Sequence, residues 1–277
     1  MPVPSSAVAD AYARLTGVFP GLTVTEAGPG ESVPDGGGWT SAASLAAGGS
    51  GLDAFLAWDD AQVLRDYGTP ARPDVVASFG LHRYAWPACL LFTVPWFLHR
   101  RVPRLPVTHV SYDRSAGRMA VRPAAFACLP GDPAAALPGA CVVRDKEALR
   151  AELRSAVAEH LEPVLAGFGP RMRRRGRALW GMATDEVVEG LWYVAHLLGE
   201  QERAVRELEL LLPGATRPYV GSAAFRELTG PDGESLPTRD RASCCMFYTV
   251  RPEDLCVTCP RTPDADRIAK LTATAAG

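Results

Sequence analysis

Four of the seven cysteines in this 277-residue sequence lie close together near its C-terminal end. Cys244, Cys245, Cys256 and Cys259 form the pattern C-C-x10-C-x2-C. Cysteine thiolates bind zinc and iron–sulfur clusters, and a C-x2-C pair also occurs in thioredoxin-like redox sites. The pattern therefore predicts a metal or redox site in this segment.

The adjacent pair Cys244 and Cys245 separates these possibilities. Structural zinc sites usually place two to four residues between their near ligands. Neighbouring side chains diverge, above all in extended backbone, so a tetrahedral site around one ion is awkward here. A binuclear cluster spreads its sulfur ligands more widely, and we infer a 2Fe-2S cluster with four cysteine ligands. A zinc knuckle that only stabilises the C-terminal segment is the alternative interpretation.

A second group of residues that could take part in chemistry is cationic. Five arginines precede Trp180 within seven residues: Arg171, Arg173, Arg174, Arg175 and Arg177. Such a patch could dock an acidic electron donor or attract the oxygen-rich rim of a metal chelate. A solvated loop between two helices explains the same pattern.

Other motifs are missing from the sequence. There is no G-x-G-x-x-G after a strand and no G-x-x-x-x-G-K-[ST], so a nicotinamide or flavin site of its own is not indicated. The histidines form no ligand pair, and His160 and His196 are expected in a core or on a helix face. Asp185, Glu186 and Glu189 are spaced like the solvated face of a helix and receive no catalytic role.

Composition and termini indicate the compartment. The net charge of −2 argues against nucleic-acid binding, and the segment Met1 to Ser6 has no signal-peptide features. The longest apolar stretch, Trp86 to Leu98, contains two prolines and is expected to be a core segment rather than a membrane span. We therefore expect a cytoplasmic protein with reduced thiols, in which the other three cysteines are small buried hydrophobes: Cys89, Cys128 and Cys141.

Hydrophobic periodicity predicts the elements that must position these residues. The expected fold is α+β and predominantly helical, with a helical body, a small β-element and an irregular C-terminal iron–sulfur segment. Helices are expected over 50–68, from Pro73 to a kink or end at Pro87, and over 88–98, 149–168, 178–198 and 201–211. A β-hairpin is expected over 107–112 and 119–122. Segment 26–51 is expected to be a surface loop, and the chain beyond Gly214 to be irregular.

The cysteine pattern resembles that of the FhuF-like ferric-siderophore reductases, and the helix-rich body around Trp180 and Gly181 is similar in layout. In that family all four motif cysteines ligate a 2Fe-2S cluster. The resemblance therefore implies the ligands Cys244, Cys245, Cys256 and Cys259. It also implies a division into a siderophore-binding body, residues 1–235, and a cluster-binding segment, residues 236–277.

The activity that follows from the resemblance is transfer of one electron to Fe(III) in an imported siderophore, expected to be of the hydroxamate type. The expected electron donor is a separate protein, such as a ferredoxin or a flavin reductase, and transient association with a siderophore importer fits this role. An iron–sulfur sensor or adaptor and a zinc-stabilised interaction protein are the alternatives. The sensor would need a DNA-binding element, which the negative net charge disfavours.

Overall fold

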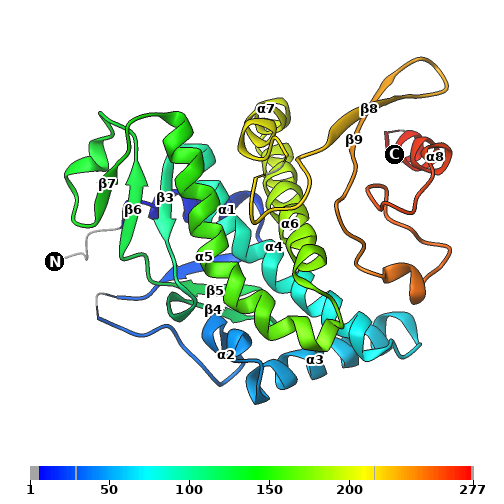
Figure 1. The fold of residues 1–277 in the computed structure, drawn as a ribbon, viewed down its shortest axis with the longest axis horizontal. Coiled ribbons are helices and arrows are strands. Elements are labelled where there is room, and N and C mark those ends of the chain that lie inside the picture. The colour runs from blue at the N-terminus through cyan, green and yellow to red at the C-terminus, as the bar shows by residue number, and fades with distance from the viewer. Residues whose placement is uncertain (1–5, 29, 215, 276–277) are drawn as a thin grey trace.

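The computed structural model describes residues 6–28, 30–214 and 216–275 (Figure 1). Its helices are α1 (Ala9–Val18), α2 (Ala42–Ala47), α3 (Ser50–Tyr67), α4 (Pro73–His99), α5 (Lys146–Met172), α6 (Gly176–Leu197), α7 (Gln201–Leu211) and α8 (Asp264–Ala275). Its strands are β1 (Thr23–Glu26), β2 (Trp39–Ser41), β3 (Arg101–Arg104), β4 (Val110–Asp113), β5 (Arg118–Val121), β6 (Ala125–Cys128), β7 (Ala140–Val142), β8 (Phe225–Thr229) and β9 (Ser235–Arg239). The predominantly helical α+β fold is confirmed.

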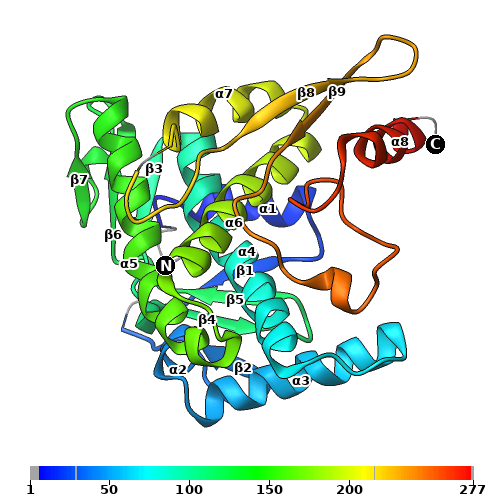
Figure 2. The ribbon, with the colours of Figure 1, turned by 45° about the vertical axis from the view of Figure 1, so that its right-hand side comes forward.

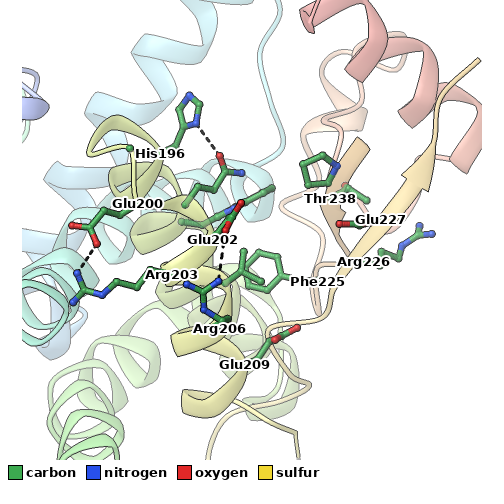
Figure 3. Close-up of a pocket in the computed structure, with 15 residues that line it drawn as sticks. His196, Glu200, Glu202, Arg203, Arg206, Glu209, Phe225, Arg226, Glu227 and Thr238 are labelled. Carbon is green, nitrogen blue, oxygen red and sulfur yellow. Dashed lines mark hydrogen bonds and ion pairs between the residues drawn. The ribbon is translucent and has the colours of Figure 1, made fainter. Parts of the chain in front are cut away.

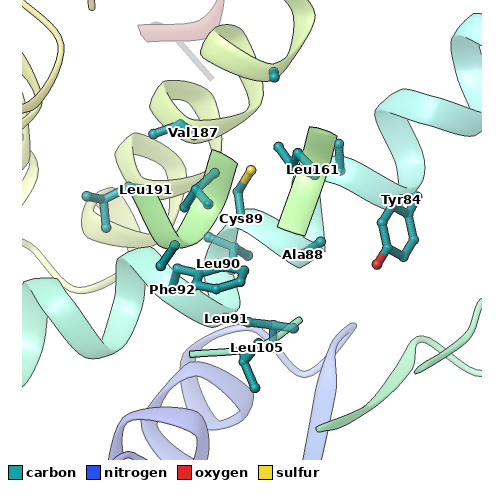
Figure 4. Packing of buried hydrophobic residues seen from close by; sticks show 14 of the residues in the cluster. Tyr84, Ala88, Cys89, Leu90, Leu91, Phe92, Leu105, Leu161, Val187 and Leu191 are labelled. Carbon is teal, nitrogen blue, oxygen red and sulfur yellow. The ribbon is translucent and has the colours of Figure 1, made fainter. Parts of the chain in front are cut away.

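Helix α4 forms the centre of the body. It packs against α1, α3, α5 and α6 and is buried along most of its length. Its residues Ala88 to Phe92 interlock with Leu161 of α5 and Val187 of α6 (Figure 4). No helix among the described residues is long and apolar enough to cross a membrane. The apolar stretch is thus core, as predicted.

The predicted interruption of α4 at Pro87 is wrong, because one helix continues through both Pro87 and Pro95. A proline leaves the carbonyl four residues earlier without its helical donor. For Pro95 that carbonyl belongs to Leu91, and the Tyr12 hydroxyl of α1 donates to it at 3.0 Å. Burial against four other helices and this replacement hydrogen bond stabilise the helix through its prolines.

The other predicted helices, now α3, α5, α6 and α7, begin and end close to their expected positions with one exception, whereas α1 was not predicted. Helix α3 ends at Gly68, whose φ of 66° suits a glycine C-cap. The Asp145 side chain caps α5 by accepting from the Ala148 backbone N–H at 2.8 Å. Helix α5, however, passes Gly169 and ends at Arg173, which adopts a left-handed conformation with a φ of 54°.

Two small sheets flank the helices. One has the strand order β1-β5-β4-β2 and contains the predicted hairpin, with Val110 opposite Val121 and Tyr112 opposite Met119. The other has the order β3-β6-β7. The expected loop over 26–51 is only partly correct, because it contains β2 and α2. Helix α2 begins where the Ser41 hydroxyl accepts from the Ser44 backbone N–H.

The chain beyond Gly214 is more ordered than expected. It forms the antiparallel hairpin β8–β9, a 3-10 turn over Phe247–Thr249 and helix α8. Figures 1 and 2 both show the hairpin and α8 at the side of the helical body, beyond α6. The expected boundary between residues 235 and 236 falls at the start of β9, and the two-part division stays a prediction.

Candidate functional site

The cysteine segment is attached to the body through a buried carboxylate on α6. Asp185 is fully buried and accepts four hydrogen bonds. Its Oδ1 receives Arg239 Nη2 at 3.0 Å and the Ala242 backbone N–H at 2.9 Å. Its Oδ2 receives the backbone N–H and the hydroxyl of Ser243, each at 2.9 Å. One side chain therefore determines the path of the backbone directly before Cys244.

The predicted solvated face of α6 is wrong for two of its three carboxylates. Asp185 and Glu186 are buried, and only Glu189 is partly exposed. Arg239, itself fully buried, pairs with Asp185 and with Glu189 at 3.0 Å each. Buried carboxylates require such partners because an unpaired charge is costly in the protein interior. Residue spacing along α6 could not predict this burial, because the arginine that pairs with Asp185 lies 54 residues away in the sequence.

Arg241 places a buried cation next to the cysteines. Its side chain is only 8% exposed and lies 3.6 Å from Asp185 Oδ2 and 3.9 Å from Glu186 Oε1. Burial opposes its charge, but the carboxylates of Glu186, Asp185 and Glu189 raise the pKa of Arg241 above its ordinary value. Its Nε and Nη2 have no hydrogen-bond acceptor among the described residues. These two nitrogens face the carboxylates of Asp185 and Glu186 at ion-pair distance instead.

The four cysteines differ in exposure. Cys259 is buried, Cys244 and Cys245 are half-buried, and Cys256 is exposed. Burial, with smaller contributions from the thiols of Cys259 and Cys245, raises the pKa of Cys244. The segment thus has an interior side at Cys259 and an exposed edge at Cys256.

Backbone N–H groups point at two of the sulfurs. The Met246 N–H donates to Cys244 Sγ at 3.4 Å, and the Arg261 N–H donates to Cys259 Sγ at 3.5 Å. In iron–sulfur proteins, hydrogen bonds to the sulfur ligands are one of the factors that set the reduction potential.

Contacts on both sides hold the cysteine loops in place. Phe247 packs against Tyr67 of α3 and Phe79 of α4, with ring centroids 5.4 and 6.0 Å apart. On the other side, the buried Arg267 of α8 donates to the Cys259 carbonyl at 2.9 Å and pairs with Asp240 at 2.7 Å. The cysteines therefore lie between the α3–α4 corner and α8.

The residues present fit a 2Fe-2S cluster. Four cysteine thiolates are its standard ligand set, and a four-thiolate cluster carries a net negative charge. The buried positive charge of Arg241, which interacts electrostatically with Cys245 and Cys256, matches that charge. Among the described residues, no group of three or more histidine, cysteine, aspartate or glutamate side chains is arranged to hold a metal ion.

The predicted arginine patch is only partly brought to the site. Arg174, half-buried at the α5–α6 turn, donates from Nη2 to the Cys244 carbonyl at 2.8 Å. Arg171 pairs with Asp53 at 2.6 Å, while Arg175 and Arg177 are exposed and form no ion pair within the described ranges. Trp180 packs edge-on against Tyr219, with ring centroids 5.5 Å apart.

The remaining cysteines and histidines follow the predictions with one correction. Cys89 and Cys128 are buried as expected, but Cys141 is exposed on strand β7. His160 is a core residue that hydrogen-bonds the Leu105 carbonyl and the Tyr84 hydroxyl. His196 lies on the exposed face of α6 and contacts Gln201.

Fold and site together define a predominantly helical protein with a C-terminal four-cysteine segment suited to an iron–sulfur cluster. Comparison with known families matches residues 241–261 to the FhuF 2Fe-2S C-terminal domain. The match confirms the predicted resemblance to the FhuF-like ferric-siderophore reductases and indicates a 2Fe-2S cluster as cofactor. It begins at Arg241, so it includes the buried cation as well as the cysteines. No curated protein matches the chain.

Proposed function

We propose that this protein is a cytoplasmic reductase that transfers one electron to Fe(III) held in a hydroxamate-type siderophore. The observation that carries the proposal is the match of residues 241–261 to a 2Fe-2S domain of the ferric-siderophore reductases. Hard oxygen donors hold Fe(III) much more tightly than Fe(II). Addition of one electron to the metal therefore favours its release.

The four cysteines would hold the cofactor, with Cys244 and Cys245 on one loop and Cys256 and Cys259 on the other. A bound 2Fe-2S cluster with thiolate ligands supplies one-electron transfer at a reduction potential of about −400 mV, and its surroundings adjust that potential. The exposed side chain of Cys256 marks the edge nearest to solvent, where donor and acceptor can approach. Arg241 stabilises negative charge next to the cysteines.

The electron must come from a separate protein, and the arginine patch is the proposed docking surface for it. Arg175 and Arg177 are exposed cations without ion-pair partners among the described residues. They lie beside Arg174, which contacts the Cys244 carbonyl. An acidic carrier, such as a ferredoxin or the flavin domain of a reductase, would be guided to the cysteine segment by this surface. Each electron it delivers reduces one Fe(III) to Fe(II).

Anaerobic purification followed by a trapping assay tests the proposal. The protein should be red-brown with one 2Fe-2S cluster per chain, and it should bleach on reduction. Reduced protein mixed with a ferric hydroxamate should then release Fe(II) to a ferrous chelator faster than the same mixture with protein carrying Cys259→Ser. A colourless protein with stoichiometric zinc would support the interaction protein instead. A cluster that yields no faster trapping would support the sensor or adaptor.

A further inference from the structure

Helix α8 is attached to the cysteine segment through a buried arginine. Arg267 is only 3% exposed, whereas the other described side chains of α8 are exposed or partly buried. An arginine carries several N–H donors in a fixed planar arrangement, and it is almost never fully buried unless partners satisfy them. The partners of Arg267 therefore show which parts of the chain this side chain connects.

Two nitrogens of the guanidinium bond the loop that carries Cys256 and Cys259. Nη2 donates to the Cys259 carbonyl at 2.9 Å, and Nε donates to the Thr262 carbonyl at 3.1 Å. Thr262 in turn closes the loop, because its hydroxyl donates to the Cys256 carbonyl at 2.8 Å and its backbone N–H donates to the Cys259 carbonyl at 3.0 Å. Arg267 thus holds the backbone that bears both cysteines.

The third nitrogen bonds the end of the strand that leads to the other two cysteines. Nη1 donates to the Asp240 carboxylate at 2.7 Å and to the Arg239 carbonyl at 3.4 Å. Asp240 directly follows β9, and the chain continues from it to Cys244. Asp185 of α6 fixes the backbone in between. A displacement of Arg267 therefore changes the separation of the two cysteine loops.

We infer that Arg267 is a positioning residue for the cluster, whose guanidinium joins the two cysteine loops and fixes the separation of their thiolates. The cluster-binding unit then extends to α8, beyond the segment 241–261 that matches the family domain. Groups that orient metal ligands from behind are important for retention, and their loss typically costs about 10- to 100-fold in metal affinity. The inference depends on the 2Fe-2S cofactor and is independent of siderophore reduction.

Release of iron from the cluster-loaded protein to excess EDTA, followed anaerobically by visible absorbance without siderophore or electron donor, tests the inference. We expect Arg267→Gln to release iron about 10- to 100-fold faster than the unaltered protein. Arg267→Lys keeps the charge and the ion pair with Asp240, but an ammonium replaces the planar fork, so this variant should regain only part of the retention. The electron paramagnetic resonance spectrum of the reduced cluster should also change in Arg267→Gln, because its cysteine ligands are displaced.

Arg226 provides the matched control, because its ion pairs attach the same helix and none of them, within the described ranges, reaches a cysteine loop. It lies on β8 beside Phe225, at the wall of the groove between α7 and the hairpin (Figure 3). Its guanidinium pairs with Asp264 of α8 at 2.5 Å and with Asp240 at 2.9 Å. Arg226→Gln should therefore leave the release rate and the resonance spectrum unchanged. Far-UV circular dichroism verifies the fold of each variant.

The outcomes separate this inference from the proposed function. An unchanged release rate and resonance spectrum in Arg267→Gln would overturn the inference. Equal acceleration in Arg267→Gln and Arg226→Gln would do the same, since attachment of α8 alone would then retain the cluster. Full retention in Arg267→Lys would also count against it, because the ion pair with Asp240 would then be sufficient. None of these results bears on the reductase, since the assay contains no siderophore.

Discussion

Replacement of Asp185 by asparagine is the most direct test of how the cysteine segment is held. The carboxylate accepts from Arg239, Ala242 and twice from Ser243, and both Asp185 and Arg239 are fully buried. An asparagine offers one oxygen and one NH2 group. Two of the four hydrogen-bond donors would then face the NH2 group, which cannot accept a hydrogen bond. Arg239 would also lose one of its two carboxylate partners. Breaking a buried ion pair in this way costs about 3–5 kcal/mol.

The assay is urea unfolding of the cluster-loaded protein, followed both by far-UV circular dichroism and by visible absorbance. We expect Asp185→Asn to lower the free energy of unfolding by at least about 3 kcal/mol, with early loss of the visible band. Asp53→Asn is the matched control, since Asp53 pairs with Arg171 at the surface, and it should cost less than about 1 kcal/mol. Equal effects of the two substitutions would refute the assignment of Asp185 as the anchor of the segment.

Three further changes have defined outcomes. Cys259→Ser should abolish the visible spectrum whereas Cys141→Ser, at an exposed position, should preserve it; an intact spectrum in the first variant would contradict the ligand assignment. Arg241→Gln should lower the reduction potential by about 100 mV in an anaerobic redox titration, since loss of a nearby buried positive charge, worth about 2 kcal/mol at an effective dielectric constant of about 20, disfavours the more negative reduced state. Arg251→Gln, at a partly exposed position, is its control, and equal shifts would argue against a special role of the buried cation. Burial lowers the pKa of His160 to about 4, so the unfolded chain takes up a proton near pH 6.5 before the folded one does. The free energy of unfolding should therefore fall by about 2 kcal/mol between pH 7 and pH 5, and His160→Gln should remove that part of the pH dependence in urea unfolding.

The parts that could be predicted from the sequence are those with a local cause. The cysteine pattern indicated its cofactor because the four cysteines and their spacing lie within one short segment. The helices α3, α6 and α7 follow from apolar periodicity, and the end of α3 follows from the glycine at its C-cap, because both signals act within a few residues.

The parts that could not be predicted depend on distant partners. Continuation of α4 through Pro95 is stabilised by packing against other helices and by the Tyr12 hydroxyl, which comes from α1. Burial of Asp185 requires Arg239, and a spacing rule for one helix contains no information about it. The groove between α7 and the hairpin likewise involves residues from separate elements, so no single segment of the sequence predicts it.

The attachment of the cysteine segment to α6 also has a consequence for the order of biosynthesis. All elements of the helical body, from α1 to α7, precede the cysteines in the chain. The nascent chain thus exposes Asp185 and the α3–α4 corner before Cys244, the first of the four clustered cysteines, leaves the ribosome. The four clustered cysteines then emerge next to the surface of α6 and the α3–α4 corner, to which their segment attaches. A misfolded body would therefore lack the surface to which the cysteine segment is attached.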